Sequence, residues 1–153
     1  MKVLITKFSI LTIFCLTQCI IEHSYQVNSF IVNQSGKSLQ IYFYKGGILD
    51  AEFQEVISKE EKRLVSSDET FTYSGLLSIE DFDSLIVEFD DMKKLVHYGF
   101  NKSGNNPNAI LFDNQRNLFN EDNYVKETIE NKKYKHESEH IFTFNEQDYL
   151  NAK

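Results

Sequence analysis

Two histidines that flank a pair of glutamates form the sharpest chemical motif in the chain. Residues 136–140 read His-Glu-Ser-Glu-His and satisfy the H-E-x-x-H pattern. In zinc metalloproteases this pattern lies on a helix, so that histidines four residues apart share one zinc ion while the glutamate activates the bound water. A zinc-dependent hydrolase would therefore use His136, Glu137 and His140.

The residues around the motif favour a strand instead of a helix. Tyr134 precedes it and Ile141-Phe142-Thr143-Phe144 follows it, and aromatic and β-branched residues of this kind are typical of strands. Histidines four apart on a strand are separated by roughly 13 Å, which is too far for both to bind one zinc ion. We therefore expect a solvated strand face at 136–140, with no metal site and no catalytic residue, and keep the hydrolase as an alternative.

The other polar residues are explained by structural roles, without a catalytic or metal-binding function. His97 lies between Val96 and Tyr98, which indicates a partly buried, hydrogen-bonded core residue instead of a general base. The acids near it lack the D-x-[DN]-x-[DN]-G spacing of a calcium loop and are expected to be solvated turn residues: Asp81, Asp83, Asp90 and Asp91. The same is expected of a later polar group: Asp113, Asn114, Asn120, Glu121, Asp122 and Asn123.

The first eighteen residues have the composition of an export signal. Lys2 and Lys7 precede or interrupt a short apolar block that runs to Leu16. A positive start followed by such a block is the usual form of a signal peptide. No Ala-x-Ala-like cleavage site appears before Tyr25, so an ordinary signal peptidase has no evident cutting point.

A cysteine supplies a different processing site. Leu16-Thr17-Gln18-Cys19 resembles the lipobox of bacterial lipoproteins, in which the cysteine becomes lipidated, although Gln18 stands where Gly, Ala or Ser is usual. We expect a lipoprotein signal peptide over 1–18, an acylated Cys19 and a tether over 19–24. The only other cysteine is Cys15, so the rest of the chain has no thiol for catalysis, a disulfide or a metal.

Two other interpretations of the leader stay open. Residues 3–21 are nearly long enough to span a bilayer as an uncleaved anchor, but a charge at Lys7 would be costly there. Secretion without an anchor is the second, and it would make Asn33-Gln34-Ser35 and Asn101-Lys102-Ser103 possible glycan acceptors.

Residues 84–100 are the clearest structural element and read as two strands joined by a turn. Leu85, Val87 and Phe89 alternate with polar or smaller residues, and alternation resumes after the polar residues 90–93. Such a hairpin is marginal alone and needs further strands or a second sheet to cover it. The same alternation predicts short strands elsewhere: 26–32, 39–44, 51–57, 63–66, 71–73 and 134–144.

These elements predict a single all-β domain over residues 25–153. The first two strands are expected to form a hairpin across the turn at 33–37, and 101–131 reads as a long loop with apolar anchoring residues. Asn145 with Asp148 three residues later resembles a capped helix start. Short strands at intervals of about ten residues favour an antiparallel β-sandwich, Ig-like or similar, with one short C-terminal helix.

The charge of the chain excludes one class of partner. Its 153 residues carry a formal charge of −7 at pH 7. An acidic surface repels phosphate backbones, so we expect no nucleic-acid partner. It also repels an anionic bilayer, so membrane attachment should come from the lipid on Cys19 and not from a basic surface.

Several segments together resemble small uncharacterised lipoproteins of Bacteroidota-type bacteria. They are the leader with Cys19, Tyr25-Gln26-Val27, residues 31–37, residues 83–89, Lys93-Lys94-Leu95 and Phe142-Thr143-Phe144 before a short helix. The resemblance implies a lipid-anchored protein of the cell envelope, at the outer membrane or cell surface. It implies no activity, catalytic residue or cofactor.

We therefore expect a membrane-anchored, exported lipoprotein that acts without catalysis or cofactors, as a binding or structural module with an envelope protein or glycan as partner. A glycan-binding accessory lipoprotein is the alternative, and it would display tyrosines on one sheet as a stacking surface. The candidates for such a surface are Tyr25, Tyr42, Tyr44, Tyr73 and Tyr98.

Overall fold

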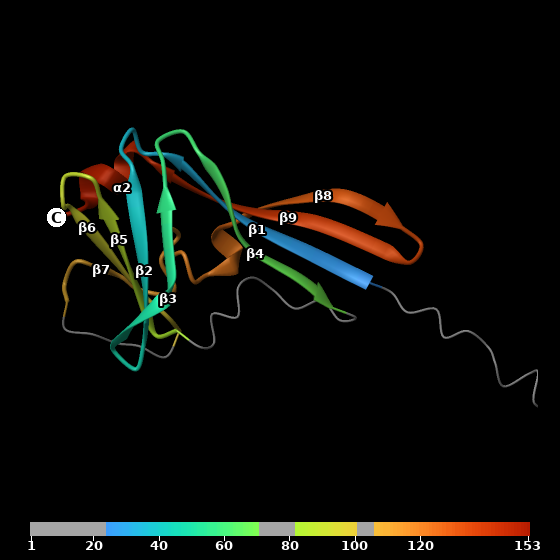
Figure 1. The fold of residues 1–153 in the computed structure, drawn as a ribbon, viewed down its shortest axis with the longest axis horizontal. Helices are drawn as coiled ribbons and strands as arrows, with labels where there is room; N and C mark the ends of the chain where they lie inside the picture. The colour runs from blue at the N-terminus through green and yellow to red at the C-terminus, as the bar shows by residue number, and fades with distance from the viewer. Residues whose placement is uncertain (1–23, 71–81, 101–105) are drawn as a thin grey trace, which may run out of the picture.

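Two β-sheets packed together make up most of the structure, a computed structural model that describes residues 24–70, 82–100 and 106–153 (Figure 1). A single short α-helix ends the described chain. The predicted β-sandwich with a C-terminal helix is confirmed. The expected signal peptide over 1–18, Cys19 and the strand at 71–73 lie outside the described residues.

The four-stranded sheet holds the first and last strands of the chain side by side. Its order is β4-β1-β9-β8, with bounds β1 Ser24–Gln34, β4 Lys62–Thr70, β8 Val125–Lys132 and β9 Lys135–Asn145. Strand β1 runs parallel to β9 and antiparallel to β4, and β8 and β9 form a hairpin. Figure 1 shows β1, β9 and β8 extending well beyond the second sheet.

The five-stranded sheet is built around the hairpin predicted at 84–100. Its order is β3-β2-β5-β6-β7, with bounds β2 Leu39–Lys45, β3 Ile48–Ile57, β5 Ser84–Phe89, β6 Lys94–Tyr98 and β7 Ala109–Ile110. Strands β5 and β6 pair antiparallel, as expected. Leu85, Val87 and Phe89 all face the core and are buried.

The chain crosses between the sheets after β1, so the predicted hairpin of the first two strands is wrong. β1 pairs with β4 and β9, whereas β2 pairs with β3 and β5. The buried Asn33 side chain fixes the crossing, because its Nδ2 donates to the carbonyl oxygens of Lys37 (2.7 Å), Ile57 (3.2 Å) and Ser58 (3.1 Å). The Asn33 side-chain amide thus joins the turn after β1 to the turn after β3. The predicted positive φ is found at Gly36, at +78°.

The same geometry removes one of the two possible glycan acceptors. Asn33 is fully buried, and its Oδ1 accepts hydrogen bonds from the backbone N–H and the hydroxyl of Ser35. A side chain enclosed and hydrogen-bonded in this way is not accessible for glycosylation in the folded domain. Asn101 lies outside the described residues.

Two pairs of the described strands are parallel, which corrects the antiparallel part of the predicted sandwich. They are β1 with β9 and the short pairing of β6 with β7. No tight turn connects either pair, so nothing local sets the relative direction of the strands. Alternating burial is the same in both directions, and the sequence pattern therefore could not distinguish them.

Part of the segment predicted as a long loop is regular structure. Residues 101–131 include β7, the 3₁₀ turn η2 (Glu121–Asn123) and most of β8. β8 is an edge strand whose side chains are mostly exposed, so it has no apolar alternation to reveal it. The apolar anchoring of the loop is confirmed at Leu118, Phe119 and Tyr124, which are buried in the core.

Helix α2 (Glu146–Asn151) begins with the predicted cap. The Asn145 side chain accepts from the Asp148 N–H (3.2 Å), while the Asp148 carboxylate accepts from the Asn145 N–H (2.8 Å), which makes a reciprocal capping box. Asp148 is buried and also forms an ion pair with Arg116 from the loop before β8. The helix start, the loop and the end of β9 are therefore locked together.

The hydrophobic core occupies only part of the four-stranded sheet. Along β9, the face that packs on the second sheet carries buried Phe142 and Phe144 near the C-terminal end but Ser138 and His136 toward the other. The same face of β1 carries Ile31, Ser29 and Val27, all of them buried. Toward the extended half of this sheet, polar side chains are therefore interspersed with apolar ones on this face.

Candidate functional site

The H-E-x-x-H motif lies on strand β9 and not on a helix, as the sequence predicts. His136 and His140 share one face of the strand but stand roughly 13 Å apart along it. The His136 ring stacks on Tyr25, with 4.9 Å between centroids and 15° between planes. Within residues 24–70, 82–100 and 106–153, no group of three or more His, Cys, Asp or Glu side chains is placed to hold a metal ion.

His140 corrects the expectation of a wholly solvated strand face. Its side chain is buried, with 1% of its surface exposed, whereas His136 is half-buried. Burial lowers the pKa of His140, and the positive charge of Lys126 lowers it further. The second histidine of the motif therefore belongs to the packed part of the sheet, and the two rings lie in different environments.

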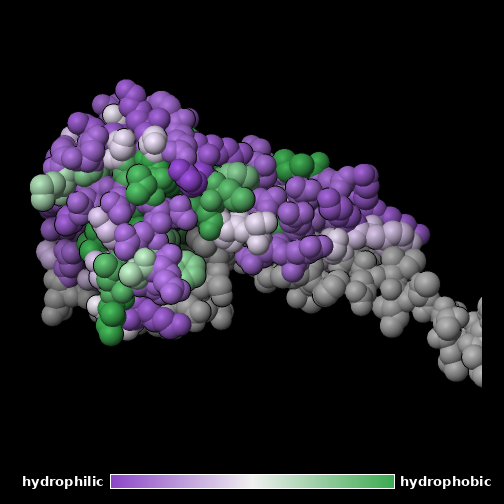
Figure 2. Space-filling model, in the orientation of Figure 1, coloured by the Kyte–Doolittle hydropathy of each residue, from purple (hydrophilic) through white to green (hydrophobic). Residues whose placement is uncertain are grey.

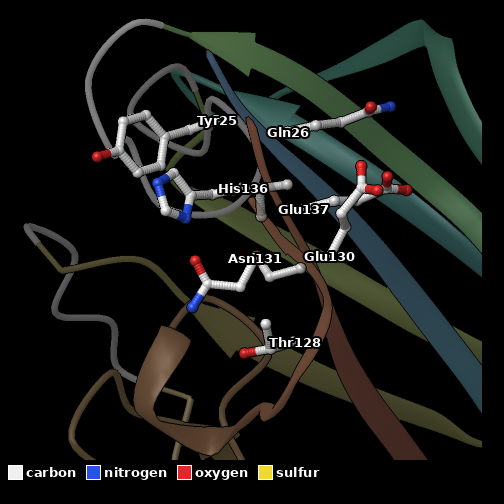
Figure 3. Close-up of a pocket in the computed structure, with 9 residues that line it drawn as sticks. Tyr25, Gln26, Thr128, Glu130, Asn131, His136 and Glu137 are labelled. Carbon is white, nitrogen blue, oxygen red and sulfur yellow. The ribbon is translucent and has the colours of Figure 1, made fainter. Parts of the chain in front are cut away.

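His136 lines a groove formed by β1, β8 and β9 of the four-stranded sheet. The groove has a volume of about 200 Å³ and is lined by Tyr25, Gln26, Val27, Thr128, Glu130, Asn131, His136, Glu137 and Ser138 (Figure 3). That volume is small beside the usual range for drug-sized ligands. Figure 3 shows Tyr25, His136 and Asn131 projecting to one side of the strands, while Gln26, Glu130 and Glu137 project to the other.

The acids of the groove are engaged in ion pairs and do not face the histidine. Glu130 forms ion pairs with Lys132 and with Lys135 (3.2 Å), and hydrogen bonds from these two lysines lower its pKa. Glu137 pairs with Lys135 at 3.3 Å. A general acid needs a raised carboxyl pKa and a place beside the reacting atoms. His136 and the two carboxylates project to opposite sides of the sheet, so they do not form an acid–base pair.

His97 is a hydrogen-bonded core residue, as predicted, and its burial is complete. Its Nδ1 accepts the N–H of Leu118 at 3.1 Å, and its ring packs edge-on against Phe144. Nε2 has no hydrogen-bond partner among the described residues. Burial lowers the pKa of His97 to about 3, with a smaller contribution from the charge of Arg116. The ring is therefore neutral and enclosed in the core.

The acids around the central hairpin act as turn residues where the structure describes them. Asp83 accepts from the Gly47 N–H (2.9 Å), Asp90 accepts from the Ser38 N–H (3.4 Å), and Asp91 accepts from the Tyr149 hydroxyl (2.7 Å). Asp81 lies outside the described residues. The polar group of the later loop behaves similarly, with side chains that cap the turns of the loop: Asn114 and Asn120.

Three of the five candidate tyrosines share one face of the five-stranded sheet. Buried residues of β2, β5 and β6 point to the core, and the alternate positions point away from it. Across these strands the register sets Tyr44 and Tyr98 on either side of Ser84, and Tyr42 beside Ile86. We call Tyr42, Tyr44 and Tyr98, with Ile86 and Val96 between them, the tyrosine face.

The tyrosines of this face are half-buried, and neighbouring ones lie within about 10 Å of each other. Tyr42 and Tyr44 are two residues apart on one strand, about 7 Å, while Tyr98 lies two strands away, roughly 10 Å. The other two candidates are elsewhere: Tyr25 lines the groove on the four-stranded sheet, and Tyr73 lies outside the described residues.

A hollow of about 190 Å³ adjoins the tyrosine face and carries polar side chains. Its lining is Ser38, Leu39, Gln40, Val56, Glu88, Phe89 and Asp90. Gln40 and Glu88 belong to the row next to Tyr42 and Ile86, because the register pairs Gln40 with Glu88 and Glu88 with Lys94. Lys94 Nζ donates to the Glu88 carboxylate at 2.8 Å, and this hydrogen bond raises the pKa of Lys94. Aromatic rings, amide groups and one ion pair thus lie on a continuous surface.

Exposed apolar side chains occur mainly at strand ends and edges. Figure 2 shows them over the joined ends of β2 and β3, where Ile48 and Leu49 are exposed, and near the β3–β4 edge, where Val56 and Leu64 are exposed. Charged and polar residues surround them in this view. The exposed apolar surface on this side is divided into small areas and does not form one broad patch.

No family model matches the sequence, and neither the curated proteins nor the solved structures contain a match for the chain. Within the described residues, no helix has both the length and the apolar character needed to cross a membrane.

Proposed function

We propose that the protein is an exported lipoprotein, anchored through an acylated Cys19, that binds a saccharide of the cell envelope without catalysing a reaction. The lipobox-like Leu16-Thr17-Gln18-Cys19 supports the anchor, and only residues 20–23 separate it from the first strand. A lipid chain on the first residue of the mature protein would hold the domain at a membrane surface.

The tyrosine face is the observation that supports saccharide binding. Sugar rings have apolar C–H faces that stack on aromatic rings, and their hydroxyl groups hydrogen-bond to amide and carboxylate side chains. Tyr42, Tyr44 and Tyr98 supply such rings on one surface, and the polar hollow beside them supplies Gln40 and Glu88. Tyrosine combines a large contact area with a polar hydroxyl, which suits a partly wet binding surface.

The same surface is less suited to the other two classes of function. A protein-binding site usually has an apolar centre depleted of charge, whereas the hollow beside the tyrosines is lined by the acidic residues Glu88 and Asp90. An enzyme would bring together titratable groups with perturbed pKa values in a pocket. The most perturbed histidine, His97, is enclosed in the core. Saccharide binding is therefore the function that this arrangement of side chains supports best.

Alanine substitutions on the tyrosine face should weaken saccharide binding. Binding of the purified domain would be measured by titration calorimetry against soluble polysaccharides and solubilised peptidoglycan. For the saccharide that binds, Tyr42→Ala and Tyr98→Ala should each raise Kd about fivefold to tenfold, since an aromatic contact contributes about 1 kcal/mol beyond its buried area.

Tyr25→Ala is the matched control, because Tyr25 is a half-buried tyrosine on the other sheet. It should leave Kd unchanged, and thermal unfolding would confirm that all three variants are folded. Equal losses in all three variants would contradict the tyrosine face as the site. Failure of the wild-type domain to bind any saccharide tested would contradict saccharide binding itself.

A further inference from the structure

The turn between β8 and β9 is a basic element in an otherwise acidic protein. Residues 132–135 read Lys-Lys-Tyr-Lys, while the whole chain carries a formal charge of −7. The side chains of Lys132 and Lys135 are 74% and 47% exposed. Lys133 is exposed and lies over the Tyr134 ring, 5.1 Å from its centroid. We call these four residues the lysine turn.

Acidic residues near the lysine turn offset only part of its charge. Glu130 forms ion pairs with Lys132 and Lys135, and Glu137 with Lys135. Lys133 contacts no carboxylate in the described part of the chain. At the same end of the sheet, β4 carries Asp68 and Glu69, but they lie across β1, on the far side of the sheet from β8. The positive charge is thus confined to the β8–β9 edge.

The lysine turn lies at the point where the folded domain begins. The Ser24 N–H donates to the Tyr134 carbonyl oxygen at 3.0 Å, and the parallel register pairs Ser24 with Lys135. Figure 1 shows the start of β1 and the β8–β9 turn together at one end of the molecule. The five-stranded sheet and α2 are at the opposite end. Any segment that leads into Ser24 therefore arrives beside these lysines.

The length of the tether limits how far this end can be from a membrane. Cys19 and Ser24 are five positions apart in the sequence. Five residues span at most about 18 Å even when fully extended. An acylated Cys19 sits at the bilayer surface, so the lysine turn must stay within about that distance of the lipid headgroups, in any conformation of the intervening residues.

We propose that the lysine turn contacts anionic lipid headgroups and orients the anchored domain upright on the membrane. This inference rests on the lipid anchor of the proposed function. Lysines near an anionic surface are attracted to it, and tyrosine favours the boundary between water and lipid. The acidic remainder of the domain is repelled by the same surface. The two effects act together and keep the tyrosine face away from the bilayer.

Single tryptophans can report which end meets the lipid, because the chain contains none of its own. Tyr134→Trp places the probe in the lysine turn. Leu150→Trp, at a 58% exposed position on α2, is the matched control at the opposite end. Each full-length variant would be produced in a bacterium that acylates lipoproteins and reconstituted into vesicles of phosphatidylcholine, with or without phosphatidylglycerol, that contain brominated lipid as quencher.

Quenching should be strong at position 134, stronger with phosphatidylglycerol present, and weak at position 150 on both kinds of vesicle. Replacing the three lysines by glutamine in the Tyr134→Trp background should remove the effect of phosphatidylglycerol. Each lysine near an anionic surface changes the population of the contacting orientation about fivefold. Equal quenching at the two positions, or no response to phosphatidylglycerol, would overturn the proposal.

Flotation of the vesicles separates this result from a failure of the anchor. Protein that floats with both kinds of vesicle but shows no preferential quenching at position 134 leaves the lipid anchor intact and overturns only the orientation. Protein that carries no acyl chain and does not float with phosphatidylcholine vesicles contradicts the anchor, and the orientation proposal fails with it.

Discussion

Replacing Asp148 with alanine is expected to lower the free energy of unfolding by about 2–3 kcal/mol, because the change removes a buried carboxylate that caps α2 and pairs with the half-exposed Arg116. Arg116 Nε donates to Asp148 Oδ1 at 2.9 Å, and Nη2 donates to Oδ2 of the same carboxylate and to the Thr143 carbonyl oxygen. The carboxylate also accepts the Asn145 N–H as part of the helix cap. One substitution thus removes contacts among β9, α2 and the loop before β8.

The loss would be measured by urea unfolding at neutral pH. Single domains are commonly stable by only about 5–15 kcal/mol, so the variant should unfold at a much lower urea concentration. Glu146→Ala is the control, since Glu146 is an exposed acid in the same helical turn, and it should cost no more than about 0.5 kcal/mol. A loss below about 1 kcal/mol for Asp148→Ala would show that the ion pair does not hold this end together.

The second large effect is a loss of stability in mild acid caused by His97. Its pKa is about 3 in the folded domain, whereas an exposed histidine has a pKa of 6.5. Between these two pH values the unfolded chain binds a proton that the folded chain does not, so stability falls as the pH falls. His97 should therefore contribute about 2 kcal/mol of destabilisation between pH 6.5 and pH 4.5.

Urea unfolding at a series of pH values would isolate this contribution. His97→Gln removes the titrating ring but keeps an acceptor for the Leu118 N–H, so its stability should depend less on pH between 6.5 and 4.5. Part of the pH dependence should persist, because burial also lowers the pKa of His140. His136→Gln, at a half-buried position in the groove, serves as the control. An unchanged slope in His97→Gln would contradict a neutral, enclosed His97.

Local patterns in the sequence predict the elements that depend on local physics. The alternation of Leu85, Val87 and Phe89 indicates a strand buried on one face, and β5 is that strand. Aromatic and β-branched residues after His140 indicate β9, which excludes a shared zinc ion by spacing alone. Asn145 and Asp148 indicate the helix cap. Each of these features involves residues a few positions apart.

Features that depend on distant residues were not predictable in this way. Asn33 decides that the chain crosses to the second sheet by bonding to Ile57 and Ser58, which are far away in the sequence. The parallel pairing of β1 with β9 joins the two ends of the domain. Edge strand β8 is mostly exposed and lacks the alternation of apolar and polar residues that marks a half-buried strand, so its sequence resembles that of a loop.

In the candidate sites, too, local contacts could be predicted from the sequence and contacts between distant residues could not. Tyr42 and Tyr44 are two residues apart, so strand alternation alone puts them on one face. Tyr98 joins them only because β6 pairs with β5 in a particular register. The groove requires Tyr25 to lie beside His136, and the lysine turn requires Tyr134 to meet Ser24. Both contacts follow from the parallel register of β1 and β9, which the sequence pattern does not reveal.

The intact mass and detergent partitioning of the membrane-extracted protein test the central claim most directly. The protein would be expressed in a bacterium that processes lipoproteins, beside Cys19→Ser and the control Cys15→Ser. We predict that the wild type enters the detergent phase as a chain that begins at an acylated Cys19, that Cys15→Ser behaves in the same way, and that Cys19→Ser loses both the acyl mass and the detergent partitioning. An unacylated, aqueous wild-type product would contradict the lipoprotein interpretation and the membrane orientation inferred from it.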